Sequence, residues 1–267
     1  MIKDITIGQY IPGKSFIHKL DPRTKILMSL VYIIDLFIIN QFKGYIFITV
    51  FTFLIIFVSK IQMKYIYRSL KPIVILIIFT GALNIFMTTG NAAPLFHWKF
   101  IHIYKEGLIL AAFMSIRLIF LIIGTSMVTY TTSPIELTDG IEKLLKPFSK
   151  IGLPAHEFAM MMTIALRFIP TLIDETDKIM KAQMARGAEL DSGNIIKKAK
   201  NLIPILVPLF ISSFRRADEL AMAMESRCYR GGEGRTRMKQ LKFTSKDSVA
   251  VICNVILVAV SVFSNYV

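Results

Sequence analysis

The sequence predicts an all-α integral membrane protein in which about five transmembrane helices carry a cytoplasmic unit of one short amphipathic helix and two long kinked helices. Hydrophobic residues make up 54% of the 267 residues, and the mean hydropathy of +0.57 is too high for an ordinary soluble domain. The chain also carries a formal net charge of +14, so its charges must be concentrated outside the apolar stretches. The third observation is the spacing of apolar residues, which changes from continuous runs to a helical period in the middle of the chain.

Five apolar runs have the composition of membrane-spanning helices. They cover residues 26–40, 44–59, 72–89, 107–130 and 248–267. A helix needs about 20 residues to cross the hydrocarbon core of a bilayer. The first two runs are shorter than this, so we expect their ends to lie near the membrane interface.

The short loops between these runs differ in positive charge. The loop after the second run contains Lys60, Lys64, Arg68 and Lys71 without an acidic residue, whereas the loop after the first run contains a single lysine. Loops rich in lysine and arginine stay in the cytoplasm. The sequence therefore predicts a cytoplasmic N-terminus and an external C-terminus.

This orientation divides the chain into three parts. Residues 1–130 form an N-terminal cytoplasmic segment and the first four transmembrane helices, residues 131–247 form a cytoplasmic helical domain, and residues 248–267 form the last transmembrane helix.

The cytoplasmic domain contains two long helical patterns. In the first, apolar residues recur every three or four positions from Pro154 to Met184, and the pattern keeps its register across Pro170. We expect Pro170 to kink this helix without ending it, and Gly187 to end it.

The second long helix is expected from about residue 195 to residue 228, with kinks at Pro204 and Pro208. A shorter amphipathic helix over residues 135–150 precedes both long helices. Its lysines favour a position along the membrane surface, and the alternative is a solvated helix that packs on its neighbours.

Each long helix ends in a short segment centred on one arginine. The segments are Ala185, Arg186 and Gly187 in the first helix and Ser226, Arg227 and Cys228 in the second. A guanidinium group keeps its charge and forms bidentate contacts with carboxylates, so an exposed pair of such tips indicates a docking function. The alternative is that each arginine only balances the partial negative charge of its helix end.

Methionine and phenylalanine are concentrated on the apolar faces of the two long helices. The residues are Phe158, Met161, Met162, Phe168, Met180, Met184, Phe210, Phe214 and Met224. Methionine adapts to partners of different shape, so we expect these faces to bind a membrane partner. Packing of the two helices on each other is the alternative, and two crossing helices bury only part of such long faces.

Two charged residues fall inside the apolar runs. Asp35 lies in the first run and Arg117 in the fourth, so the two are candidates for an ion pair between spans. We interpret both as structural.

Two further patterns are weak. Residues 8–15 match the phosphate-loop pattern G-x-x-x-x-G-K-[ST], but that loop needs a preceding strand and a following helix in an α/β domain, and the next element here is a membrane span. The basic, glycine-rich residues 231–239 lack the aromatic platform of an RNA-binding segment, so we interpret them as a loop near anionic headgroups.

The N-terminal stretch that begins Gly8-Gln9-Tyr10 and ends Asp21-Pro22-Arg23-Thr24-Lys25 resembles the opening segment of the transmembrane T components of energy-coupling factor transporters, which are bacterial importers of vitamins and transition metals. The two arginine tripeptides resemble the paired helix-end motifs of that family, and residues 167–172 also resemble a family segment. Cys228 departs from the family pattern, in which glycine is common at this position.

The resemblance implies that this chain acts in a prokaryotic cell membrane as the coupling subunit of an ABC importer. Two ABC-type ATPase subunits, identical or different, would receive Arg186 and Arg227, and a substrate-binding membrane protein, the S component, would bind the apolar faces. No catalytic residues, cofactor, metal or nucleic-acid partner is expected. The alternatives are a stand-alone permease or channel, which would line a path with polar residues, and a nucleotide-binding enzyme built on residues 8–15.

Overall fold

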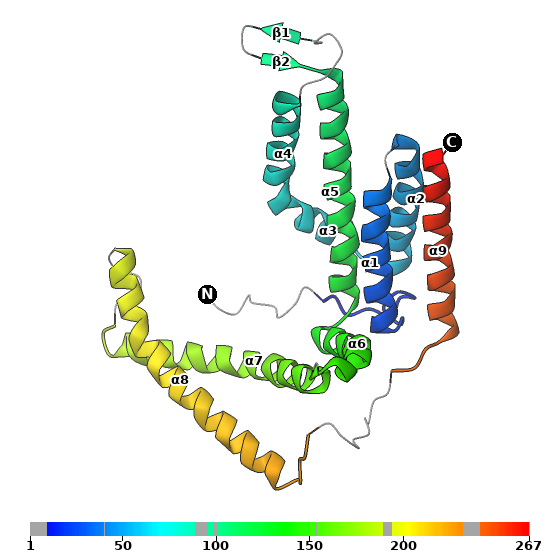
Figure 1. The fold of residues 1–267 in the computed structure, drawn as a ribbon. Coiled ribbons are helices and arrows are strands. Elements are labelled where there is room, and N and C mark those ends of the chain that lie inside the picture. Colours follow the sequence, from blue (N-terminus) through cyan, green and yellow to red (C-terminus); the bar gives the residue numbers. More distant parts are fainter. Residues whose placement is uncertain are drawn as a thin grey trace. The chain divides into compact units, whose positions relative to one another are not determined.

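The computed structural model describes residues 10–39, 41–88, 96–98, 101–152, 154–188, 194–231 and 241–266. Within these ranges the regular secondary structure is helical apart from one short antiparallel hairpin, β1 Phe96–Trp98 with β2 Ile101–Ile103 (Figure 1). The prediction of an all-α membrane protein is confirmed.

The chain forms two compact units. The membrane unit comprises Gln9–Gly140 and Leu241–Val267, and the helical unit comprises Met1–Gly8 and Ile141–Gln240. The boundary between them falls inside helix α6, Pro134–Leu145.

The membrane unit is a bundle of parallel and antiparallel helices. Its helices are α1 Pro22–Ile38, α2 Phe42–Ser59, α3 Met63–Leu70, α4 Val74–Met87, α5 Lys105–Thr131 and α9 Ser245–Tyr266. Helices α1 and α2 both pack against α5 and α9, whereas α4 runs along α5 (Figure 1). Helix α9, from the C-terminal part of the chain, therefore packs in the same bundle as α1 and α2.

Among the described residues, five helical segments are long and apolar enough to cross a membrane: Phe42–Ser59, Met63–Met87, Lys105–Thr131, Ala155–Ala185 and Ser245–Asn265. Their number agrees with the prediction, but one member differs. The first predicted span corresponds to α1, whose 17 residues reach about 26 Å at 1.5 Å per residue, short of a hydrocarbon core of about 30 Å. Ala155–Ala185, which we predicted to be cytoplasmic, meets the criterion of length and composition in its place.

The third predicted span has a different beginning. We assigned residues 60–71 to a loop, but they include helix α3 and lead into the single turn of 3₁₀-helix Lys71–Ile73, after which α4 begins. Pro72 lies in that turn because its ring nitrogen has no hydrogen to donate to a regular α-helix. The predicted span ends 40, 89 and 267 lie outside the described residues.

Helices α1 and α9 run parallel and are joined by polar contacts every seven residues. The backbone N–H of Asp21 donates to Asp247, the Asn254 amide donates to the Met28 carbonyl, and the Ser261 hydroxyl donates to Asp35. A step of seven residues is two helical turns, so all three contacts lie on one seam between the helices. Hydrogen bonds of this kind hold membrane helices together where no hydrophobic force acts between them.

Asp35 and Arg117, the two candidates for an ion pair between spans, have separate partners. Asp35 is fully buried against Ser261, whereas Arg117 donates from Nε to the Tyr45 hydroxyl at 3.2 Å and from Nη2 to the Ile39 carbonyl at 3.2 Å. The Ile39 carbonyl follows the end of α1, where helix carbonyls have no partner in the helix. Both charges therefore join helices, in two separate places.

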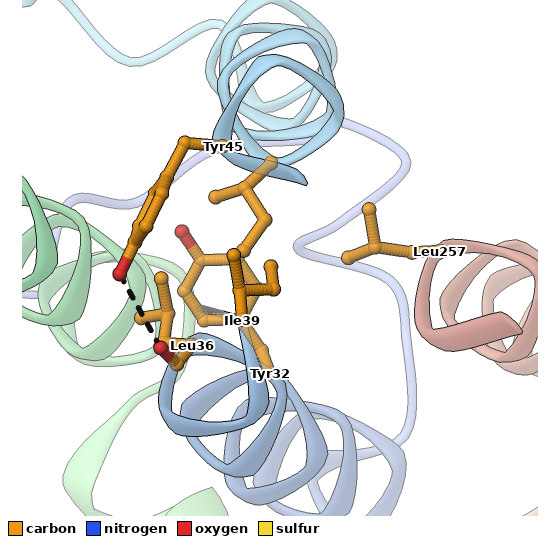
Figure 2. Close-up of a cluster of buried hydrophobic side chains, with 6 residues drawn as sticks. Tyr32, Leu36, Ile39, Tyr45 and Leu257 are labelled. Atoms are coloured by element: carbon orange, nitrogen blue, oxygen red, sulfur yellow. Dashed lines mark hydrogen bonds between the residues drawn. The ribbon is translucent and has the colours of Figure 1, made fainter. Parts of the chain in front are cut away.

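One apolar core of the membrane unit lies between α1, α2 and α9 (Figure 2), and a second cluster of buried side chains joins α2, α3 and α5. The fully or nearly fully buried side chains of the first core are Tyr32, Leu36, Ile39, Tyr45, Ile48 and Leu257. Both tyrosines have a partner for their hydroxyl group: Tyr32 shares a hydrogen bond of 2.9 Å with Thr52, and Tyr45 donates to the Leu36 carbonyl at 3.4 Å. The polar atoms of this core are satisfied, which a low-dielectric interior requires.

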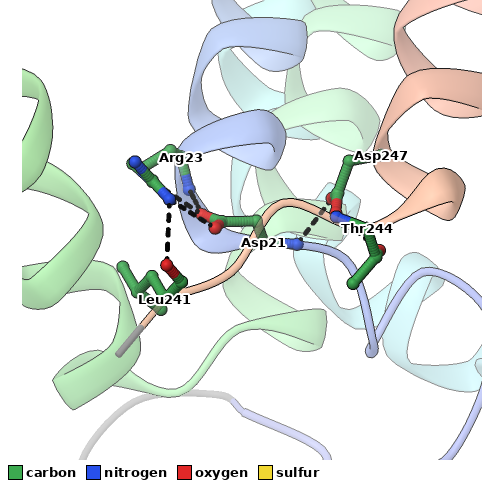
Figure 3. A network of polar contacts seen from close by, with 5 residues as sticks. All are labelled: Asp21, Arg23, Leu241, Thr244 and Asp247. Atoms are coloured by element: carbon green, nitrogen blue, oxygen red, sulfur yellow. Dashed lines mark hydrogen bonds and ion pairs between the residues drawn. The ribbon is translucent and has the colours of Figure 1, made fainter. Parts of the chain in front are cut away.

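A polar network joins the first turn of α1 to the segment before α9 (Figure 3). Asp21 caps α1 and holds Arg23 in an ion pair of 2.9 Å, and Arg23 also reaches the Leu241 carbonyl at 3.5 Å. On the other side, Asp247 accepts from the Asp21 N–H at 2.7 Å and from the N–H and hydroxyl of Thr244 at 2.8 and 2.7 Å.

Replacement of Asp247 by alanine is expected to leave the backbone N–H groups of Asp21 and Thr244 without an acceptor. Since Asp247 is fully buried and accepts three hydrogen bonds, we expect the free energy of unfolding to fall by about 2 kcal/mol or more. Thermal unfolding of the purified chain measures this loss. The matched control is Lys246→Ala at the exposed neighbouring position, and equal melting temperatures for the two variants would contradict the role of this network.

Candidate partner-docking site

The candidate site lies on the two long helices of the helical unit, α7 Ala155–Ala185 and α8 Ile195–Glu225. Pro170 lies inside α7, and Pro204 and Pro208 lie inside α8, so both helices continue through their prolines as predicted. The shorter helix predicted over 135–150 is present as α6 followed by the 3₁₀-helix Lys146–Ile151.

Helices α7 and α8 cross, and polar contacts fix them at the crossing (Figure 1). Glu175 of α7 accepts a hydrogen bond from the Ser212 hydroxyl and an ion pair of 2.8 Å from Arg216, both on α8. Nearer the end of α7, Gln183 donates to the Pro204 carbonyl at 3.2 Å.

Helix α7 ends in a Schellman motif that places Arg186 at its last turn. The N–H of Ala188 donates to the Gln183 carbonyl at 3.0 Å and the N–H of Gly187 to the Met184 carbonyl at 3.0 Å. Gly187 has a φ of +87°, a conformation that glycine adopts without steric cost. Arg186 is therefore the C-cap residue of this helix.

Helix α8 ends in the same way. The N–H of Tyr229 donates to the Met224 carbonyl at 3.0 Å and the N–H of Cys228 to the Glu225 carbonyl at 2.8 Å. Cys228 takes the left-handed conformation with a φ of +57°, so it occupies the place that Gly187 has in α7. Arg227 then corresponds to Arg186, and the two tips share one backbone geometry as well as one sequence pattern.

The structure leaves both arginines available for binding. Arg186 and Arg227 are exposed, and in the part of the chain that the structure describes no hydrogen bond or ion pair of either guanidinium is observed. The small neighbours Ala185, Ser226 and Cys228 are exposed as well. A guanidinium in this setting offers its donors to an acidic groove on another protein.

The two tips are well separated. Gln183, three residues before Arg186, contacts α8 at Pro204, and the 21 residues from there to Glu225 span roughly 30 Å at 1.5 Å per residue.

The predicted apolar faces are largely exposed. Among the nine residues, Phe158, Met161, Met162, Met184, Phe210 and Phe214 are exposed, and Phe168, Met180 and Met224 are half-buried. The Phe210 and Phe214 rings form an edge-to-face pair with centroids 4.6 Å apart. Aliphatic residues that we left out of the site extend the face of α8: Leu202, Ile203, Leu206, Val207 and Ile211. Their spacing of three and four residues is visible in the sequence, but the predicted face included only methionine and phenylalanine residues.

No group of three or more metal-ligating side chains comes together within the described residues. Ser15, the last residue of the phosphate-loop pattern, shares a hydrogen bond of 2.7 Å with His18, and α1 begins only at Pro22. Gly8 of that pattern lies outside the described residues.

Comparison with known proteins gives consistent results. A sequence model of the family described as CbiQ, cobalt transport protein, matches residues 13–238. The energy-coupling factor transporter transmembrane protein EcfT of Clostridium kluyveri is 74% identical over 264 residues, which cover 99% of this chain and 98% of that protein. The proteins of the same name from Thermosediminibacter oceani and Bacillus subtilis are 58% and 44% identical, and the matches cover 98% or more of every chain involved.

The two helix ends predict opposite effects of substitution. Gly187→Ala adds a Cβ to a residue in the left-handed region, whereas Cys228→Gly removes one. Each change alters the free energy of the helix-end turn by about 1 kcal/mol, which changes the equilibrium for local opening of that turn by a factor of about five. We expect amide hydrogen exchange at Ala188 to become faster in Gly187→Ala and exchange at Tyr229 to become slower in Cys228→Gly. Cys228→Ser is the matched control because it keeps a side chain of similar size. Equal exchange at Tyr229 in both Cys228 variants would show that the left-handed conformation is not formed.

Proposed function

This chain belongs to the CbiQ family and is a transmembrane component of energy-coupling factor transporters, and on that premise we propose that it transmits ATP-driven motion from two cytoplasmic ATPases to a substrate-binding membrane protein. The observation that carries the proposal is the equivalence of the two helix tips. Arg186 and Arg227 hold the same position in two identical helix-end motifs, so each tip suits the same kind of groove.

The ATPases are proposed as separate ABC-type subunits, one for each tip. An acidic residue in each groove would pair with the guanidinium, and closure of the ATPase pair on ATP would draw the two tips toward each other. The crossing at Glu175, Ser212 and Arg216 supports this mechanism, because it joins α7 and α8 by charged hydrogen bonds between their ends. Movement of the tips then changes the angle between the helices without separating them.

The proposed S component would cover the exposed apolar faces of α7 and α8. A row of exposed residues from Leu202 to Phe214 on α8 is costly in water, so it favours a hydrophobic partner or lipid. The cargo is proposed to be a vitamin or a transition-metal ion, as the family description of cobalt transport suggests. Recognition of the cargo would then belong to the S component.

We propose that the chain lies in a prokaryotic cell membrane with its N-terminus and residues 131–247 in the cytoplasm. Two observations support this orientation. The basic residues Lys60, Lys64, Arg68 and Lys71 are all exposed and follow the last residue of α2 in the sequence. Helix α2 runs antiparallel to α1 and α9, so both of these helices begin at the end of the bundle where α2 finishes (Figure 1). A solute path of its own has less support, since Asp35 and Arg117 are both engaged in contacts between helices.

Reversal of the charge at either tip is expected to weaken the ATPase complex. Arg186→Glu and Arg227→Glu would place a carboxylate against the proposed acidic groove, and we expect retention of the ATPase pair to fall by about tenfold or more. Co-purification of the reconstituted complex and substrate uptake in proteoliposomes measure the effect. Arg215→Glu is the matched control, because it makes the same change at an exposed position within α8. Unchanged assembly and uptake in the double tip variant would exclude the proposed role.

Polar substitution of the α8 face is expected to release the S component but not the ATPases. We expect Phe210→Ser with Phe214→Ser to reduce retention of the S component by about tenfold while the ATPases stay bound. Phe148→Ser serves as the control, since Phe148 is also exposed in the helical unit but lies outside α7 and α8. Loss of both partners together, or of neither, would contradict the assignment of this face.

A further inference from the structure

The membrane unit contains a cavity of about 460 Å³ between α1, α2, α5 and α9. It is lined by the first turns of α1 and α9 and by the last turns of α2 and α5, and the segment from Phe16 to Leu20 covers it on one side. All of these segments meet at one end of the bundle. The volume lies within the range of roughly 300–1,000 Å³ that is usual for ligand pockets in proteins.

The polar side chains of the lining are already engaged. Lys25 donates to the carbonyls of His18 and Thr131 at 3.2 and 2.9 Å, and the Tyr32 hydroxyl is bonded to Thr52. The three other polar residues of the lining donate to backbone carbonyls: Ser29 to Ile26, Thr131 to Met127 and Asn254 to Met28. The rest of the lining is apolar, so the cavity suits a ligand without polar atoms.

Water is a poor occupant of such a space. A buried water needs two to four polar partners, and the lining offers few that are not already bonded. An empty cavity is also unfavourable, because the atoms that line it lose dispersion contacts on one side. An apolar ligand removes both costs.

The mouth of the cavity is apolar as well. Leu54 of α2 and Val249 of α9 line the cavity and are 56% and 52% exposed, and Cys253 of α9 is also exposed. All three belong to helices that are long and apolar enough to cross the membrane. Lipid acyl chains are therefore the ligands that meet this opening in a bilayer.

We propose that this cavity binds one acyl chain of a phospholipid, taken from the leaflet at the end where α1 and α9 begin. The acyl chain would enter past Leu54 and Val249 and reach Tyr32 and Phe51, which line the cavity. Tyr32 belongs to the apolar core, and Phe51 packs against it. A bound acyl chain would then fill the space that α1, α2, α5 and α9 leave between them.

The test uses the full chain reconstituted in nanodiscs of phosphatidylglycerol and released for native mass spectrometry. Val128→Phe and Ala250→Leu add volume at two walls of the cavity, on α5 and α9 respectively. Val255→Phe is the matched control, because Val255 is exposed on α9 and does not line the cavity. Thermal unfolding checks that each variant is folded. If one filling variant does not fold, the other still tests the proposal.

The expected result is one retained phospholipid on the wild-type chain and on Val255→Phe. Retention is expected to fall about tenfold or more in the filling variants, because the larger side chains occupy the space that the acyl chain needs. Equal retention in all variants would overturn the proposal. Retention of a free fatty acid or a detergent in place of a phospholipid would also overturn it.

Discussion

The structure of the membrane unit depends on the seam between its first and last helices. Asp21, Met28 and Asp35 of α1 meet Asp247, Asn254 and Ser261 of α9 at steps of seven residues, so two helices from opposite ends of the chain form a parallel pair. Membrane helices gain little from hydrophobic association, and hydrogen bonds therefore decide which neighbours pair and in which register. The other helices of the unit, including α2 and α5, pack around this pair.

The same seam determines where the helical unit is attached. The chain leaves the membrane unit after Gly140, where an added Cβ would lie 3.0 Å from Pro22, and it returns at Leu241, whose carbonyl accepts from Arg23. Both connections therefore meet at the first turn of α1.

The two binding functions proposed for the helical unit rest on different features of the chain, the backbone at the tips and the side chains on the apolar faces. At the tips, the Schellman motif determines where each arginine lies, and its left-handed residue makes the turn possible. On the faces, the helical period alone places Phe210 and Phe214 beside the exposed aliphatic residues of α8. Arginines of fixed position suit a specific groove, and a long apolar face suits partners of more than one shape.

The sequence by itself determined the long helices, because apolar runs and periods of three and four residues report local structure directly. It also identified Arg186 and Arg227, since both lie where a helix pattern stops. It did not determine the partners of Asp35 and Arg117, the heptad seam, the beginning of the third span at α3, or the cavity near Tyr32. Those features depend on contacts between residues as far as 226 positions apart, and only the tertiary structure decides which helix faces meet.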